Sequence, residues 1–320
     1  MKAVYYEHHG GPDVLQFGDL PIPEIGPDEV LVRVVATSVN PIDRRLRNGE
    51  LQEYITRTFP VVPGWDLAGE IVEIGQRVSG WNVGDKVLGL AFTWSIQHGA
   101  YAEYIPVKAD SIARKPDQFS YAQAASIPLV SLTAWQAVYE FGRVQEGDSV
   151  FIQAGAGGVG SVAIPMAKYL GAKVYTTTSR NVAFLQELGA DVVINYREQN
   201  YEEVIRDLEP DGVNMVLESL SGEDASRAAI RLAKANGAVA YMNNEPPQMP
   251  EIAERNIRAE FLHHRPDGEM LEHLTGLYET GVLTLPEIEV LPLSAAREAH
   301  VRSELGHTRG KIVLAVQELA

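Results

Sequence analysis

The chain has 320 residues, of which 45% are hydrophobic and 22% are charged, as is typical of a soluble globular protein with room for two domains. Its formal net charge of −16, with no run of basic residues, argues against nucleic acid or an anionic membrane as a partner. The absence of cysteine excludes disulfides, a thiol nucleophile and cysteine-ligated zinc.

The start of the chain, MKAVYYEHHGGPDVL, lacks the apolar core of a signal peptide. No stretch reaches the roughly 18 apolar residues that a membrane helix needs. A cytoplasmic location is therefore expected.

Up to about residue 118, short strand-like runs alternate with Gly- and Pro-rich turns, which predicts a β-rich domain. The runs are KAVYY, EVLVRVVATSV, LAGEIVEIG, KVLGL and AYAEYIPV.

From about residue 119 the pattern changes to helices that alternate with strands. A helix is predicted near YAQAASIPLVSLTAWQAVYEF. This alternation predicts an α/β fold with a doubly wound parallel sheet, that is, a Rossmann nucleotide domain over residues 119–267. The predicted strands cover 149–155, 173–179, 191–196, 214–220 and 237–242, followed by the run AEFLHH.

The last part of the chain follows RPDG and opens with an amphipathic helix, EMLEHLTGLYETG. The tail then ends in one more strand, within GKIVLAV. We expect this tail to return to the first domain, so that residues 268–320 complete the domain formed by residues 1–118.

A glycine-rich turn lies between a predicted strand and a predicted helix in SVFIQAGAGGVGSVAIPMAKYLG. Gly155, Gly157 and Gly160 form a G-x-G-x-x-G pattern, and Gly158 and Val159 complete the loop. In this context the loop allows close approach of the backbone to a pyrophosphate, with a helix N-terminus facing it. The loop is therefore predicted to bind a dinucleotide, with an ordinary glycine-rich turn as the alternative.

The end of the next strand, TTTSR, indicates which dinucleotide binds. NAD-selective enzymes usually place Asp or Glu at this strand end for the ribose hydroxyls. Here the first acidic residue after the strand is Glu187. Ser179 and Arg180 offer a hydroxyl and a guanidinium, which suit a 2′-phosphate. The predicted cofactor is therefore NADP(H), unless Arg180 is a solvated surface residue.

Eight short stretches occur in a fixed order along the chain: PDVLQFGDLPIPEIGPDEVLVRVVATSVNPID, FPVVPGWDLAGEIVEIG, VGDKVLG, GAYAEY, SLTAWQAV, AGAGGVG, LGADVVINYRE and GHTRGKIVL. With these parts in order, the chain resembles the medium-chain dehydrogenase/reductase superfamily over residues 13–314. It is most similar to the zinc-independent quinone oxidoreductase branch, which includes zeta-crystallin-like proteins and enone reductases. The resemblance implies a GroES-like catalytic domain in addition to the Rossmann domain.

The chain departs from the zinc alcohol dehydrogenases of this superfamily. Those enzymes have Gly-His-Glu where PGWDLAG stands here, and they use cysteines at both metal sites. Trp65 and Asp66 occupy these positions, and the two pairs of adjacent histidines would face opposite ways on strands. No metal is predicted.

The resemblance also implies roles for individual residues. Asn40 in VNPID would lie beside the nicotinamide, and Thr133 in SLTAW would bond the carboxamide. Tyr196 in INYRE would lie near the adenosine phosphate and Lys311 in RGKIVL near the cleft, and both are predicted to bind the cofactor. The alternatives are a turn at Asn40, a hydroxyl bonded to its own helix at Thr133, packing at Tyr196 and a solvated strand-edge lysine.

Two further candidates follow from position. Asp43 falls in the same loop as Asn40 and is grouped with it as catalytic, although an Asx-type turn around Pro41 would explain both residues. Ser219 follows the fourth predicted strand, where this fold places ligand contacts, and is predicted to bind the cofactor.

Without a metal or a thiol, a nicotinamide enzyme can still deliver hydride to an electron-poor carbon. The predicted function is NADPH-dependent reduction of a quinone or an α,β-unsaturated carbonyl. The alternatives are an enoyl-thioester reductase, and an NADPH-binding sensor or structural protein with low turnover. An RNA-binding role, suggested by relatives, is disfavoured by the charge. The family implies a homodimer, formed by pairing the run EFLHH of two copies.

Overall fold

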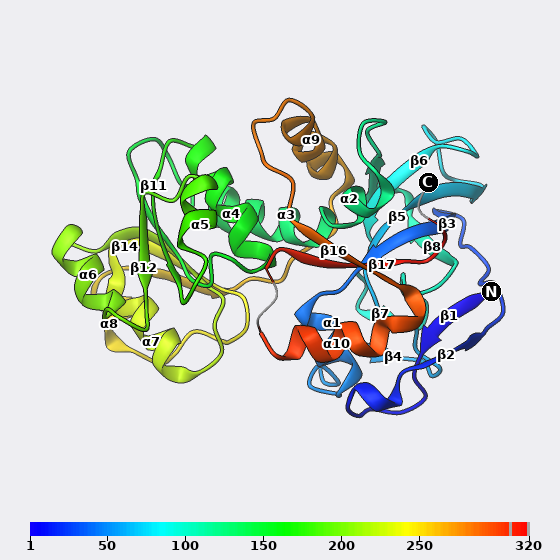
Figure 1. Cartoon of the computed structure of the whole chain (residues 1–320), viewed down its shortest axis with the longest axis horizontal. Coiled ribbons are helices and arrows are strands. Elements are labelled where there is room, and N and C mark those ends of the chain that lie inside the picture. Colours follow the sequence, from blue (N-terminus) through cyan, green and yellow to red (C-terminus); the bar gives the residue numbers. More distant parts are fainter. Residues whose placement is uncertain (307–308, 319–320) are drawn as a thin grey trace. The chain divides into compact units, whose positions relative to one another are not determined.

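The computed structural model describes residues 1–306 and 309–318, so His307 and Thr308 of the GHTRGKIVL motif lie outside the described residues. The chain divides into two compact units (Figure 1). Unit 1 comprises Met1–Leu132, Arg265–Glu279 and Leu285–Ala320, and unit 2 comprises Thr133–His264 and Thr280–Thr284.

The first boundary lies at residue 132 rather than at the predicted residue 118. Helix α2 (Tyr121–Ala125) packs on strands β3 (Glu29–Ser38) and β5 (Asp66–Ile74) of unit 1. Its alanines lie on that sheet, so the segment belongs with unit 1 although its sequence already has helical character. The division falls inside α3 (Pro128–Trp135), between Leu132 and Thr133.

Unit 1 is built on a mixed sheet in the order β16-β17-β3-β5-β6-β9, with β8 also pairing with β3. As predicted, the C-terminal strand β17 returns to this unit: in Figure 1 the red β17 runs beside the blue β3, and the two are antiparallel. The other strands of the sheet are β6 (Lys86–Leu90), β8 (Tyr104–Lys108), β9 (Ile112–Arg114), β16 (Ile288–Pro292) and β17 (Lys311–Ala315).

The core of unit 1 forms where the long strands place β-branched residues on one face. Val30, Val32 and Val34 of β3 alternate along the strand and pack with Leu67 and Ile71 of β5. The smaller elements surround this core. They are β1 (Lys2–Tyr5), β2 (Gln16–Asp19), β4 (Thr56–Arg57), β7 (Ser95–Ile96), α1 (Pro41–Arg47), α9 (Gly268–Glu279), α10 (Ala296–Glu304), and 3₁₀ turns at Pro12–Val14, Ala109–Ser111 and Leu293–Ala295.

Unit 2 contains the predicted doubly wound parallel sheet, in the order β12-β11-β10-β13-β14-β15. The strand order reverses between β10 and β13, and ligands of such sheets bind outside the carboxyl ends of the strands at that point. The strands are β10 (Ser149–Ile152), β11 (Lys173–Thr178), β12 (Val192–Asn195), β13 (Val213–Glu218), β14 (Ala233–Tyr241) and β15 (Arg258–Phe261).

Helices connect these strands, and α3 continues into a π-helical segment, Gln136–Phe141. Phe151, Val216 and Tyr241 line one face of the sheet and pack against Ile205 and Ile230 of the helices. No helix within the described ranges is long and apolar enough to cross a membrane. The helices are α4 (Gly158–Tyr169), α5 (Val182–Glu187), α6 (Tyr201–Leu208), α7 (Glu223–Leu232) and α8 (Pro250–Glu254).

Candidate functional site

The glycine loop of unit 2 connects β10 to α4, and α4 begins at Gly158 with Gly157 as its N-cap. A Cβ on Gly160 would lie 2.5 Å from the carbonyl oxygen of Ala154, and a Cβ on Gly155 would lie 2.1 Å from the Thr176 hydroxyl. Both positions therefore require glycine. The backbone passes close to itself here and leaves the first amides of α4 without a helical partner, as a phosphate-binding loop requires.

The ends of β11 and β12 bring the predicted phosphate-binding residues to one edge of the sheet. Thr178 and Asn195 are register partners, and the chain continues from them to Ser179 and Arg180 on one strand and to Tyr196 on the other. Arg180 and Tyr196 are both exposed. Exposure argues against the alternative that Tyr196 is only a packing residue.

Arg197 was missed by the sequence analysis. It is exposed and stands two residues beyond Asn195, as Arg180 stands two residues beyond Thr178. Two guanidinium groups therefore follow neighbouring parallel strands at the same edge. The signal in the sequence was the arginine in INYRE, which becomes informative only when the register of the two strands is known.

Thr133 and Gln153 are among the side chains of unit 2 that are buried without hydrogen-bond partners among the described residues. The Thr133 hydroxyl makes no such bond, so the alternative of a hydroxyl bonded to its own helix is not found. Neither end of the Gln153 amide has a partner, although this side chain is only 1% exposed and follows β10 at the start of the glycine loop. Buried polar groups are nearly always paired, so such groups at a predicted site fit a ligand that carries donors and acceptors.

Ser219 lies where the sequence predicted it, directly after β13. Its hydroxyl donates to the carbonyl oxygen of Gln153 at 2.9 Å, which ties the end of β13 to the start of the glycine loop. Asn243, after β14, donates to the carbonyl oxygen of Ser219 at 2.7 Å. The loops at the point where the strand order reverses are thus bonded to one another.

Glu218, the last residue of β13, is fully buried, and burial raises its pKa to about 7. Its carboxylate makes no hydrogen bond of normal geometry to the residues described. The Leu220 amide and the Asn244 side chain oppose this pKa shift without offsetting it. The sequence did not predict that Glu218 is buried at the carboxyl edge of the sheet and titrates near neutral pH, because an acid at a strand end normally faces solvent.

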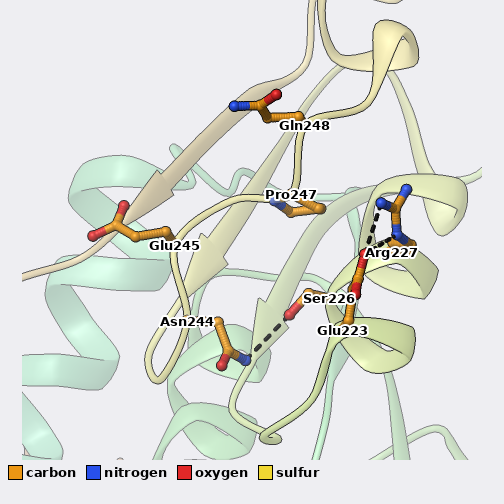
Figure 2. A pocket seen from close by; sticks show the side chains of 7 residues that line it. All are labelled: Glu223, Ser226, Arg227, Asn244, Glu245, Pro247 and Gln248. Atoms are coloured by element: carbon orange, nitrogen blue, oxygen red, sulfur yellow. Dashed lines mark hydrogen bonds and ion pairs between the residues drawn. The ribbon is translucent and has the colours of Figure 1, made fainter. Parts of the chain in front are cut away.

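A pocket of about 260 Å³ lies at the start of α7 and the loop after β14 (Figure 2). Asn244 donates to the Ser226 hydroxyl at 3.1 Å, and Arg227 forms an ion pair with Glu223 at 2.7 Å. These polar groups thus bind each other, and no predicted site residue lines the pocket. The lining residues are Glu223, Ser226, Arg227, Asn244, Glu245, Pro247 and Gln248.

In unit 1, Asn40, Asp66 and Lys311 form a buried polar cluster. Asp66 is fully buried, and its Oδ2 accepts hydrogen bonds from Asn40 Nδ2 at 2.8 Å and from Lys311 Nζ at 3.3 Å. Lys311 Nζ also donates to Asn40 Oδ1 and to the carbonyl oxygen of Val39. The lysine is 3% exposed, so it is not a solvated strand-edge residue. Sequence reasoning noted Asp66 only as a replaced zinc position, although an acid inside an apolar strand needs a buried partner.

Asn40 and Asp43 lie at the start of helix α1, where they form a capping box, rather than in the loop that the sequence predicted. Asn40 is the N-cap, and its backbone amide donates to Asp43 Oδ2 at 2.8 Å. Asp43 Oδ2 also accepts from the Tyr101 hydroxyl at 3.1 Å. Burial raises the pKa of Asp43 to about 7. This carboxyl group is therefore able to hold a proton near neutral pH.

A second buried chain of contacts holds the other end of α1. Arg47, 2% exposed, donates to His300 Nδ1 at 2.8 Å and forms an ion pair with Glu304 at 2.6 Å. Burial, assisted by the Arg47 charge, lowers the pKa of His300 to about 3, so the imidazole is neutral and accepts this bond. These contacts fix α1 to α10 and thereby fix the position of Asp43.

The described residues include no group of three or more His, Asp or Glu side chains that could hold a metal ion. Trp65, at the position of the zinc-ligating histidine, is fully buried and packs edge-to-face on Phe92 with ring centres 4.9 Å apart.

Comparison with known proteins places both units in one family. Residues 26–117 match the family described as alcohol dehydrogenase GroES-like domain, and residues 188–314 match the one described as zinc-binding dehydrogenase. A 2-methylene-furan-3-one reductase of Solanum lycopersicum is 33% identical over 98% of this chain and 79% of its own length.

Two further relatives bear on the chemistry. An NADPH-dependent alkenal/one oxidoreductase of Arabidopsis thaliana, with a chloroplastic designation, is 32% identical over 98% of this chain and 79% of its own length. The solved structure of a quinone oxidoreductase from Coxiella burnetii superposes with a TM-score of 0.89 at 37% identity, covering 99% of each chain. The predicted combination of a GroES-like domain and a Rossmann domain is confirmed.

Proposed function

Because the chain belongs to the medium-chain dehydrogenase/reductase superfamily, in its zinc-independent quinone oxidoreductase branch, we propose that it transfers hydride from NADPH to a quinone or an α,β-unsaturated carbonyl. The observation that carries the proposal is the carboxyl edge of the unit 2 sheet. There a loop that requires glycine at Gly155 and Gly160 precedes α4, and two arginines follow neighbouring strands. The names of the relatives support the acceptor class.

The residues of unit 2 fit NADP(H). The amides at the start of α4 would hold the pyrophosphate, with Gly155 and Gly160 allowing close approach. Ser179, Arg180 and Arg197 would hold the 2′-phosphate, with Tyr196 nearby. The unpartnered Thr133 hydroxyl would bond the carboxamide. When bound, NADPH supplies the hydride.

The residues of unit 1 would act on the acceptor. As hydride arrives, negative charge develops on the acceptor's carbonyl oxygen, and a fixed donor stabilises it. Asn40 has one amide hydrogen beyond the bond to Asp66, and it is the donor we propose. Asp43 is held close to it and would retain a proton near neutral pH. The proton that completes the reduction is supplied by Asp43 or by water.

The test is NADPH oxidation with 1,4-naphthoquinone, a panel of enals and enones, and crotonyl-CoA as the enoyl thioester. We expect turnover with at least one quinone or enone and a preference for NADPH over NADH. Turnover confined to the thioester would favour the enoyl-thioester reductase. Tight NADPH binding without turnover of any acceptor would favour the sensor or structural protein.

We further propose a homodimer formed through β15, which lies at the edge of the parallel sheet. An edge strand presents unpaired backbone groups, and a second copy would pair them. Light scattering at micromolar concentration should give twice the mass of the 35.1 kDa chain. A monomeric mass would contradict this. The cytoplasmic location and the absence of a nucleic-acid partner stay predictions.

A further inference from the structure

The carboxylate of Asp66 accepts hydrogen bonds from three further groups besides its ion pair with Lys311. Oδ2 accepts from Ser38, Asn40 and Lys311, while Oδ1 accepts from the backbone amide of Leu129 at 2.7 Å. These donors come from β3, the start of α1, β17 and α3. Asp66 is 0% exposed, so each bond is made away from solvent.

Lys311 is fully committed inside the same cluster. An ammonium group has three N–H bonds, and here they are directed to Val39, Asn40 and Asp66. With no donor left over, Lys311 is the buried counter-ion of Asp66. This differs from the direct cofactor contact that the sequence analysis predicted for Lys311.

The bond to Leu129 connects the cluster with α3. Leu129 is in the first turn of that helix, where backbone amides have no partner within the helix. Thr133 follows four residues later on the same helix and therefore on the same face. Asp66 thus holds the first turn of the helix that carries the unpartnered Thr133 hydroxyl one turn later.

We propose that Asp66 is a positioning residue for NADPH: through its bond to the Leu129 amide it orients the Thr133 hydroxyl toward the nicotinamide carboxamide, and Lys311 serves as its counter-ion. This inference rests on the proposed function, specifically on the assignment of Thr133 to the carboxamide. It predicts that the state of Asp66 affects only the nicotinamide end of the cofactor.

Two ligands distinguish the contacts to the nicotinamide end from the contacts to the rest of the cofactor. Dissociation constants are measured for NADPH and for 2′-phospho-ADP-ribose, which lacks the nicotinamide. In the Thr133→Val variant, NADPH should bind about 2- to 12-fold more weakly, the value of one neutral hydrogen bond, while the fragment is unaffected. The ratio of the two constants is the readout, because general damage to the fold changes both constants together.

Two matched double variants then test Asp66. Asp66→Leu with Lys311→Met removes the ion pair and the acceptor for the Leu129 amide. Asp66→Asn with Lys311→Met removes the same charges but keeps an amide oxygen as acceptor. Removing both members of a buried pair avoids leaving an unpaired charge, so both variants are expected to fold. The first should lower NADPH affinity relative to the fragment as much as Thr133→Val does, and the second should keep the wild-type ratio.

Adding Thr133→Val to the Leu/Met variant should cause no further loss, because the two changes remove one contact. Equal weakening of both ligands, an unchanged ratio in the Leu/Met variant, or full additivity would overturn the inference. An unchanged ratio in Thr133→Val would overturn the carboxamide assignment and the inference with it. Failure of every acceptor assay, with the ratios as expected, would overturn only the proposed function.

Discussion

Two sets of buried polar groups, one in each unit, differ in how their hydrogen bonds are satisfied. In unit 1, Asp66, Asn40 and Lys311 bond mainly to one another. In unit 2, the Thr133 hydroxyl and the Gln153 amide are equally buried but have no partner among the described residues. Buried polar groups that satisfy each other hold a fold, whereas groups left over at a sheet edge are available to a ligand.

This difference separates residues that the sequence analysis had grouped together. Lys311 and Thr133 were both predicted to bind the cofactor, yet only Thr133 has a polar atom free for it. The comparison therefore makes Lys311 a residue of stability and Thr133 a residue of binding. The four predictions below test this division, starting from the largest expected effect.

The buried ion pair should dominate the stability of unit 1. Lys311→Met leaves Asp66 charged and buried without its counter-ion, which typically costs about 3–5 kcal/mol in the free energy of unfolding. Chemical denaturation measures this loss. Adding Asp66→Asn should recover much of it, because the unpaired charge is removed.

A surface pair provides the control. Lys86 and Asp117 lie 3.4 Å apart with their side chains 49% and 92% exposed, so Lys86→Met should change stability little. The opposite outcome would be a small loss of unfolding free energy in Lys311→Met, as in Lys86→Met, together with weaker binding of both NADPH and 2′-phospho-ADP-ribose. Lys311 would then contact the cofactor directly, and its assignment to stability would be wrong.

Arg180 should affect binding and not stability. If its guanidinium holds the 2′-phosphate, Arg180→Ala should raise the Michaelis constant for NADPH about 10- to 150-fold, corresponding to about 1.5–3 kcal/mol for charge-assisted bonds. The Michaelis constant for NADH and the turnover at saturating cofactor should barely change, since this phosphate is remote from the hydride.

Arg197→Ala should give a smaller effect of the same kind, and Ser179→Asp should shift the preference toward NADH by placing a negative charge beside the phosphate. Equal losses for NADPH and NADH in Arg180→Ala would assign that residue to the fold.

The glycine loop should tolerate no side chain at Gly160. Its Cβ would meet the backbone of Ala154 and Gly155, which cannot move aside like a flexible side chain. Overpacking usually costs about 1–3 kcal/mol in the free energy of the overpacked conformation. Because that conformation of the loop is the one that binds the cofactor, Gly160→Ala should weaken NADPH binding about 5- to 150-fold. Gly276→Ala in α9 is the control, because no atom of the described residues outside its own helix backbone lies within 4 Å of the added Cβ. Similar NADPH affinity in the two variants would contradict the loop assignment.

Asp43 should give a pH-dependent contribution. Its pKa is raised from 3.8 to about 7 in the folded protein, so the folded state binds this proton more tightly than the unfolded state. The associated stability is fully present below about pH 4 and is lost as the pH rises to about 7. Asp43→Asn removes this contribution and keeps an acceptor oxygen for Asn40 and Tyr101.

The difference in unfolding free energy between wild type and Asp43→Asn should fall by up to about 1.4 kcal/mol per pH unit across that window and then level off. Denaturant titrations at several pH values measure it. Glu218 and His300 titrate in both proteins, so their contributions cancel in the difference. If the unfolding free energies of wild type and Asp43→Asn changed in parallel with pH, the pKa of Asp43 would not be raised by folding.

The sequence predicted most of the architecture because that information is local. The glycine loop, the strands around it and the returning C-terminal strand all followed from periodicity and turn residues. Helix α1 was missed because it is short and lies in a segment rich in arginine and asparagine, where hydrophobic periodicity is weak. Strand β16 was missed because its exposed residues give little alternation.

By itself, therefore, the sequence determined the fold class, the dinucleotide loop and the absence of cysteine ligands, since each depends on residue types at short spacing. Only the tertiary structure decided which polar residues are available for chemistry. Asp66 and Lys311 are 245 residues apart, and Thr178 and Asn195 meet only through the register of two strands. Whether a buried polar atom has a partner depends on such long-range contacts, and no local pattern encodes them.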